Sequence, residues 1–254
     1  MGIELSFLFG FVGLFFGSLL NVIIYHVLRR EPIAFPGFHC STCGYNLRPW
    51  ELIPVFSFLL LKGQCSQCHN KISWRYPLLE LMNGLLYFCA TWQNSSGSFL
   101  QLGVNFYFMS TLLVLAVIDW DTFRLPDIFT LPLLIMGIVA GFYFPQAPSG
   151  WESLGAALGI GGLFWLVSMI YPEGMGLGDV KFVAGLGAFL GANILITIFI
   201  ASVTGSIVAL IIIFLKRKSF RDQIPFGPYL ALGASIAFFW GQEIISFYIS
   251  LFGF

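Results

Sequence analysis

The sequence has very little charge. Of its 254 residues, only 9% are Asp, Glu, Lys or Arg and 58% are hydrophobic, whereas about 25% of the residues of a soluble domain are charged. Twelve basic residues balance twelve acidic ones, so the net charge gives no electrostatic support for a nucleic-acid partner. The apolar runs are long enough for helices that cross a lipid bilayer, which takes about 20 residues each. The sequence therefore predicts an all-α polytopic membrane protein.

Several catalytic signatures are missing as well. The chain has no HExxH motif, no GxSxG nucleophile elbow, and no cysteine–histidine pair in a nucleophilic setting. The first apolar run, at about residues 5–28, is preceded by Glu4 and followed by Arg29 and Arg30. This order of charges is the reverse of that in a cleavable signal peptide. We therefore expect this run to be a first transmembrane helix with its N-terminus outside the cytoplasm.

Further apolar runs divide the rest of the chain. Spans are expected at about residues 77–93, 99–118, 128–144, 153–171 and 227–250. The uncharged run from Phe182 to Leu215 is too long for one span, so we expect it to turn back in a tight hairpin near Gly191, Ala192 and Asn193. The total is about eight transmembrane helices.

The basic residues predict the orientation of these helices. All twelve fall in four segments, 29–76, 119–127, 172–181 and 216–226. The positive-inside rule places these segments in the cytoplasm and both termini outside it. We accordingly expect three parts: a first transmembrane helix over 1–28, a small cytoplasmic metal-binding loop domain over 29–76, and a membrane-embedded helical domain over 77–254.

Four of the five cysteines lie in the polar segment. They form two CxxC pairs, Cys40 with Cys43 and Cys65 with Cys68. Two such pairs converging on one ion give the tetrahedral thiolate site that Zn²⁺ favours. Disulfides are the alternative, but they are disfavoured in the cytoplasm. Four thiolates leave no open position on the metal, so we expect a structural zinc that holds together a segment too small for its own core.

Acidic residues gather in two of the predicted cytoplasmic turns. They are Asp119, Asp121, Asp127, Glu173 and Asp179. Acids at a membrane edge are candidates for function by default. Asp127 and Asp179 each begin a span, so either side chain could simply cap a helix, and Asp121 is expected to be solvated. Asp119 ends a helix, where the macrodipole disfavours a negative charge, so capping does not explain it.

A pair of these acids would suit aspartic-protease chemistry. If Asp119 and Asp179 approach each other, repulsion favours a shared proton. One carboxylate then activates a water molecule while the other donates a proton to the scissile amide. Gly176 and Gly178 would let a substrate or a neighbouring helix come close to the backbone. Lys181 is expected to anchor this turn on the cytoplasmic side.

Longer motifs give the chain a resemblance to a known family. They are "GSLLNVIIYHVLRR", the paired CxxC knuckles, "ISWRYPLLELMNG", "IDWDTFRLPD", "GMGLGDVKFVAGLGA" and "IPFGPYLALGA". In this order they resemble the type IV prepilin leader peptidases, membrane aspartic proteases of the GxGD class. The resemblance implies that Asp119 and Asp179 are the catalytic pair.

The same resemblance implies a substrate and a location. Members cut pilin-like precursors after a short, basic leader at the cytoplasmic face of the bacterial inner membrane. Many also N-methylate the new terminus with S-adenosylmethionine, an activity associated with the cysteine-bearing region.

Two other functions would use intramembrane acids. One is an ion-coupled transporter with a proton relay, but the acids gather at one membrane face and Glu80 is the main ionisable residue within a span. The other is a membrane phosphotransferase whose acids bind Mg²⁺. Loss of activity in EDTA with recovery on adding Mg²⁺ would identify the phosphotransferase.

Overall fold

The computed structural model describes residues 2–29, 39–40, 42–94, 98–171, 174–215 and 224–252. The chain forms two compact units, Met1–Ser110 and Thr111–Phe254, and each is considered by itself. Parts of the predicted topology lie outside the described residues. They are Arg30, Glu173, and the basic residues Lys216, Arg217, Lys218 and Arg221.

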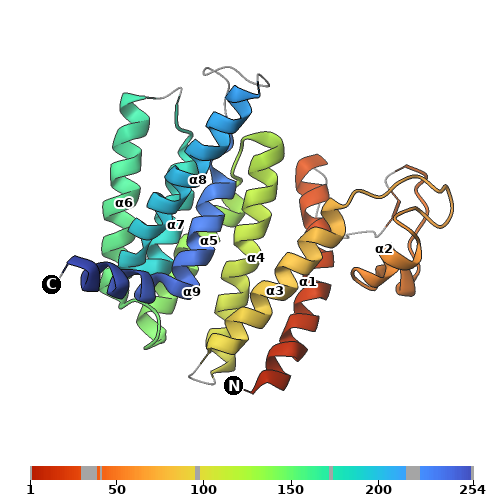
Figure 1. Ribbon diagram of the computed structural model, residues 1–254, viewed down its shortest axis with the longest axis horizontal. Coiled ribbons are helices and arrows are strands. Elements are labelled where there is room, and N and C mark those ends of the chain that lie inside the picture. The colour runs from red at the N-terminus through yellow and green to blue at the C-terminus, as the bar shows by residue number, and fades with distance from the viewer. Residues whose placement is uncertain are drawn as a thin grey trace. The chain divides into compact units, whose positions relative to one another are not determined.

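A close pair of helices forms the frame of the first unit. Helix α1 (Ile3–Arg29) lies beside α3 (Arg75–Gln93) (Figure 1). A Cβ added to Gly17 would come 2.6 Å from Cα of Glu80, so the two backbones touch only because this side chain is missing. The Asn83 amide donates to the carbonyl oxygen of Gly13 at 2.8 Å. Small residues and a buried amide are the usual means of holding helices together in lipid.

Short elements connect these two helices. They are a 3₁₀ turn, η1 (Pro49–Leu52), and helix α2 (Phe56–Leu60), with one cysteine knuckle on either side. After α3, helix α4 (Phe99–Thr122) starts in the first unit and ends in the second. The Tyr87 ring stacks on Phe106 with their centroids 3.9 Å apart, which joins α3 to the first part of α4.

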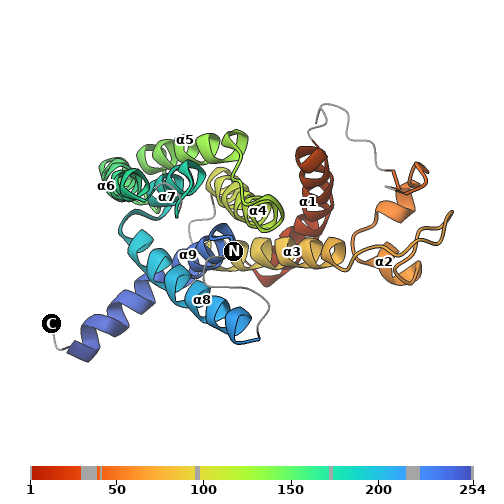
Figure 2. The ribbon, with the colours of Figure 1, turned by 90° about the horizontal axis from the view of Figure 1, so that it is seen from above.

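Helix α7 lies at the centre of the second unit. This unit contains α5 (Asp127–Tyr143), α6 (Gly150–Ile170), α7 (Leu177–Leu190), α8 (Ile194–Phe214) and α9 (Gly227–Phe252). Figures 1 and 2 both show α7 against α5 and α6. Glycines permit this packing, since a Cβ on Gly161 of α6 would lie 2.8 Å from that of Ala184. Phe182, Val183 and Leu186 of α7 are fully buried as a result.

The predicted helices and the hairpin lie where the sequence placed them in the described part of the chain. Helix α7 ends at Leu190, a 3₁₀ turn (η2, Gly191–Asn193) follows, and Gly191 has a φ of +55°. Among the residues that the structure describes, five stretches are long and apolar enough to cross a membrane, with Leu177–Phe214 counted as one. Helix α5, with 17 residues, is shorter than these. The chain is thus a helical, membrane-type protein, and eight separate spans remain a prediction.

Candidate functional site

Asp119 lies in the last turn of α4 and is almost completely buried, with 4% of its surface exposed. The sequence placed Asp119 at the end of a helix, and the helix continues three residues beyond it to Thr122. Its Oδ2 accepts a hydrogen bond of 2.8 Å from the backbone N–H of Gly227, the first residue of α9. The N-terminus of a helix favours negative charge, so α9 counteracts the unfavourable end of α4.

Asp179 comes to the same place from the first turn of α7. The N-cap of this helix is Gly176, and the half-buried Asp179 is its third residue. The Asp179 carboxylate accepts a hydrogen bond from the Gly176 N–H and repels the carboxylate of Asp119. The two acids therefore lie within electrostatic range. Asp179 is not the N-cap of its helix, since Gly176 occupies that position, but its carboxylate contacts the backbone of that residue.

The chain between α4 and α5 packs closely on the start of α7. Phe123 follows α4 with a φ of +54°, in the left-handed region that bulky residues avoid. Its N–H donates to the Asp119 carbonyl oxygen at 2.9 Å. Two residues further on, Leu125 lies against Gly178, where an added Cβ would come within 3.1 Å of the leucine Cβ. A side chain at 178 would therefore displace Leu125 by a few tenths of an ångström, while Gly176 has no comparable neighbour.

The predicted role of Asp127 differs in the structure. Asp127 is not an N-cap: Pro126 occupies that position, and no side-chain hydrogen bond caps α5. The Asp127 carboxylate instead accepts from Lys181 Nζ at 2.7 and 2.8 Å. Lys181, which was expected to anchor its turn on the cytoplasmic side, thus pairs with the first turn of α5. Both side chains of this pair are solvent-exposed by more than a third.

The two cysteine pairs form knuckles with the same backbone geometry. In the first, the Cys40 carbonyl accepts from the Gly44 N–H at 2.9 Å, and in the second Cys65 accepts from His69 at 3.0 Å. In both knuckles, the residue four positions after the first cysteine of the pair has a positive φ, +70° at Gly44 and +54° at His69. Short-range backbone hydrogen bonds thus fix each pair of sulfurs.

The knuckles converge, and their four Sγ atoms lie within 4.8 Å of one another. Cys40 and Cys68 have their sulfurs 3.8 Å apart, which is the edge of a tetrahedron with Zn–S bonds of about 2.3 Å. The backbone N–H groups of Cys43 and Thr42 lower the pKa of the Cys40 thiol to about 6.

Cys43 shows the opposite tendency. Although a backbone hydrogen bond from Tyr45 opposes it, desolvation and the facing sulfurs raise the pKa of Cys43 to about 11. Four thiolates this close repel one another, so full ionisation needs a cation among them. This donor set fits Zn²⁺.

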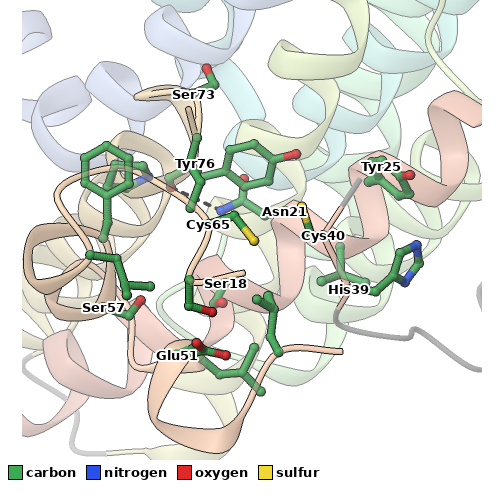
Figure 3. Close-up of a pocket in the computed structure, with 18 of the residues that line it drawn as sticks. Ser18, Asn21, Tyr25, His39, Cys40, Glu51, Ser57, Cys65, Ser73 and Tyr76 are labelled. Atoms are coloured by element: carbon green, nitrogen blue, oxygen red, sulfur yellow. Dashed lines mark hydrogen bonds between the residues drawn. The ribbon is translucent and has the colours of Figure 1, made fainter. Parts of the chain in front are cut away.

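A cavity of about 390 Å³ lies beside the knuckles in the first unit. Figure 3 shows Ser18 and Asn21 of α1 facing it together with Glu51 and Cys65 from the connecting segment. Tyr25, Phe58 and Tyr76 give the wall aromatic surface. The volume is in the range of small-molecule sites, about 300–1,000 Å³.

The sequence reasoning missed two features of these sites. Gly227 lies within the motif "IPFGPYLALGA", which by itself assigns it no role, although its N–H is the partner of Asp119. Pro225 and Pro228 flank this glycine, and proline is favoured at the start of a helix, so the two prolines signal a helix start at this point. The cavity was missed because its wall combines residues of α1, α3 and the segment between them.

The fold and these sites define a class: a polytopic helical membrane protein with paired carboxylates and a four-cysteine centre. Comparison with known proteins narrows this class. A family model described as the type IV leader peptidase family matches residues 106–210, and one described as the bacterial peptidase A24 N-terminal domain matches residues 11–94. None of the solved structures matches the chain.

Several curated proteins are similar over nearly the whole chain. One from Pseudomonas aeruginosa is 36% identical, covering 96% of this chain and 93% of its own length. Others come from Pseudomonas putida (34% identical; 96% and 93%) and Neisseria gonorrhoeae (35%; 89% and 87%). All three are named prepilin leader peptidase/N-methyltransferase. The chain belongs to the type IV leader peptidase family and is a peptidase, which speaks against the transporter and the phosphotransferase.

Proposed function

We propose that Asp119 and Asp179 are the catalytic pair of an aspartic endopeptidase that removes the short, basic leader from type IV prepilin-like precursors. The observation that carries this proposal is the approach of the two carboxylates from helix ends that are 60 residues apart in the sequence. No lysine or arginine in the described part of the chain is paired with either acid. Two like charges held in one place favour a state in which they share a proton.

Such a pair would cut a peptide bond by acid–base catalysis. The ionised carboxylate takes a proton from a water molecule, which attacks the scissile carbonyl carbon, and the protonated carboxyl group donates its proton toward the leaving amine. The Gly227 N–H fixes the orientation of Asp119, and the Gly176 N–H that of Asp179. Each carboxylate keeps its second oxygen for water or substrate.

Conservative substitutions test the pair. Asp119→Asn and Asp179→Asn keep the size of the side chain but remove its ionisation, and each should slow precursor cleavage by about 10²–10⁴-fold. Asp121→Asn is the matched control, since Asp121 lies two residues from Asp119 on the same helix and is exposed. Leader removal is measured by the mass of a co-purified precursor. Efficient processing by either catalytic variant would overturn the assignment.

We also propose that the chain N-methylates the N-terminus it creates. The printed names of the relatives support this second activity. The methyl donor would be S-adenosylmethionine, which supplies an electrophilic methyl group on a sulfonium sulfur. The cavity of about 390 Å³ has the volume and the aromatic and polar wall that a nucleoside requires. Tyr25, Phe58 and Tyr76 would hold the base or sugar, and Glu51 would accept from hydroxyl groups.

Cys40, Cys43, Cys65 and Cys68 are proposed to bind one structural Zn²⁺. Four thiolates complete a tetrahedral shell, so the ion would stabilise this segment without binding substrate. In the proposed division of the chain, 29–76 is the zinc-binding methyltransferase region, and 77–254 is the protease.

The proposed location is the bacterial inner membrane, with both termini outside the cytoplasm and cleavage at the cytoplasmic face. The distribution of basic residues supports this orientation. Alkaline phosphatase fused after Phe254 should be active, because that enzyme folds only outside the cytoplasm. An inactive fusion in cells with normal precursor processing would reverse the orientation.

A further inference from the structure

A buried carboxylate lines the cavity of the first unit. Glu80, in α3, has only 8% of its surface exposed. Its Oε2 accepts a hydrogen bond of 2.8 Å from the backbone N–H of Val55, and the side chains of Ser18 and Asn21 also hydrogen-bond to it. Three donors from two segments therefore fix the carboxylate at the wall of the cavity.

These donors are all neutral. In the described part of the chain no lysine or arginine forms an ion pair with Glu80. A buried carboxylate without a cation is unfavourable, and a positively charged ligand removes that cost. The cavity is therefore better suited to a ligand that brings a positive charge to Glu80.

Other titratable groups that line the cavity are less suited to that task. Besides the cysteines they are Tyr25, His26, His39, Glu51, Lys71 and Tyr76. Glu51 is only half-buried and accepts the Arg48 N–H at 2.7 Å, at the start of η1. Lys71 is exposed, and His26 bonds through Nδ1 to a carbonyl oxygen of its own helix at 2.8 Å.

The donor opposite Glu80 is held in an unusual conformation. Val55 has a φ of +62°, in the left-handed region that is a clear outlier for a β-branched residue. Strained residues of this kind persist where the surrounding structure holds them, often at functional sites. Here the conformation directs the Val55 N–H at the Glu80 carboxylate.

We propose that Glu80 binds the α-ammonium group of the newly cleaved substrate in this cavity and takes its proton before methylation. This role rests on the proposed N-methyltransferase activity. The proton moves from the ammonium nitrogen to a Glu80 oxygen, leaving a neutral amine. The nitrogen lone pair forms a bond to the methyl carbon of a sulfonium donor, and the carbon–sulfur electron pair stays on sulfur. The nitrogen becomes a methylammonium group, and Glu80 passes its proton to solvent.

Glu80→Gln is the decisive variant, because glutamine still accepts the Val55 N–H but is neither charged nor basic. With purified full-length protein, methylation of a cleaved pilin-like peptide at pH 7 should fall about 10-fold, because only about a tenth of the α-amine is neutral at that pH, while leader cleavage stays at the wild-type rate. Above pH of about 8 the α-amine loses its proton unaided, so the variant should recover. Glu4→Gln, an exposed carboxylate on α1, is the control and should behave as wild type.

A binding measurement tests the same contact without the methyl donor. Wild-type protein should bind a peptide with a free N-terminal amine at least 10-fold more tightly than its Nα-acetylated form, and Glu80→Gln should lose this preference. An unchanged preference, unchanged methylation in Glu80→Gln, or loss of methylation only in His26→Gln would each overturn the role of Glu80. If wild-type protein cleaves but does not methylate, the proposed second activity fails, while the peptide measurement still reports on Glu80.

Discussion

Replacing Gly227 by alanine should impair cleavage although both proposed catalytic acids are kept. The added Cβ would lie 2.8 Å from Oδ2 of Asp119 and 3.0 Å from its Cβ. Carbon atoms in contact are about 3.5 Å apart or more, so the carboxylate or the start of α9 must move by roughly 0.5 Å. Catalytic groups must be held within about 0.5 Å of their productive positions, so this shift reaches the limit. A displacement of 1 Å costs about 100-fold in rate. We therefore expect kcat/KM for precursor cleavage to fall about 10- to 100-fold, or about 1.4–2.7 kcal/mol of transition-state stabilisation.

The assay is the time course of leader removal from a purified pilin-like precursor in detergent micelles. The loss should appear in kcat more than in KM, because the substitution displaces a reacting group and leaves the peptide-binding surface unchanged. Gly155→Ala in α6 is the matched control, since its added Cβ meets no atom within 4 Å. Thermal unfolding of both variants monitors the fold. Cleavage at the wild-type rate by Gly227→Ala would refute the view that the start of α9 positions Asp119.

Three other substitutions follow from the geometry. Cys65→Ser should lower the zinc content of purified protein from about one ion per chain toward zero, as measured by mass spectrometry of the metal. It should also lower the unfolding temperature. Full retention of zinc would exclude a four-sulfur site. Lys181→Gln removes an exposed ion pair with Asp127 and should lower the unfolding free energy by at most about 1 kcal/mol. The rate of cleavage should stay within about twofold of the wild-type rate. A large loss of activity would give the pair a catalytic role. Gly17→Ala should destabilise the first unit by about 1–3 kcal/mol in chemical denaturation, because the added Cβ would lie 2.6 Å from the backbone of α3. Gly103→Ala is the control, since its added Cβ meets no atom within 4 Å.

Helices and their breaks were predictable because they depend on local signals. Apolar length and the charges between runs gave the helices, and the uncharged run from Phe182 to Leu215 was long enough to require the turn at Gly191. The cysteine spacing likewise predicted that four sulfurs converge. The number of membrane spans is harder to predict, because α5 and α7 are short and α3 carries polar residues that contact α1.

The partners of the acids were not predictable in the same way. Asp127 follows a proline at a helix start, which is typical of an N-cap, yet its carboxylate pairs with Lys181, 54 residues away. The Gly227 donor to Asp119 is 108 residues away. Periodicity and local propensity carry no information on which helix ends meet. From the acids alone, the pairing of Asp119 with Asp179 was a conditional hypothesis, and the family resemblance supported it before the structure did.

The separation of the two sites along the chain has a consequence for biosynthesis. Each knuckle closes by hydrogen bonds between residues only a few positions apart. The β-bridge of the second knuckle, between Gln64 and Lys71, is the last of these contacts along the chain. All four cysteines of the proposed metal site have therefore been synthesised before the helices of the second unit. Asp119, in contrast, obtains its Gly227 donor only when the final helix has been made and inserted. A ribosome-bound or C-terminally truncated chain would bring the four cysteine sulfurs together yet lack the Gly227 donor, so the proposed catalytic pair is completed last.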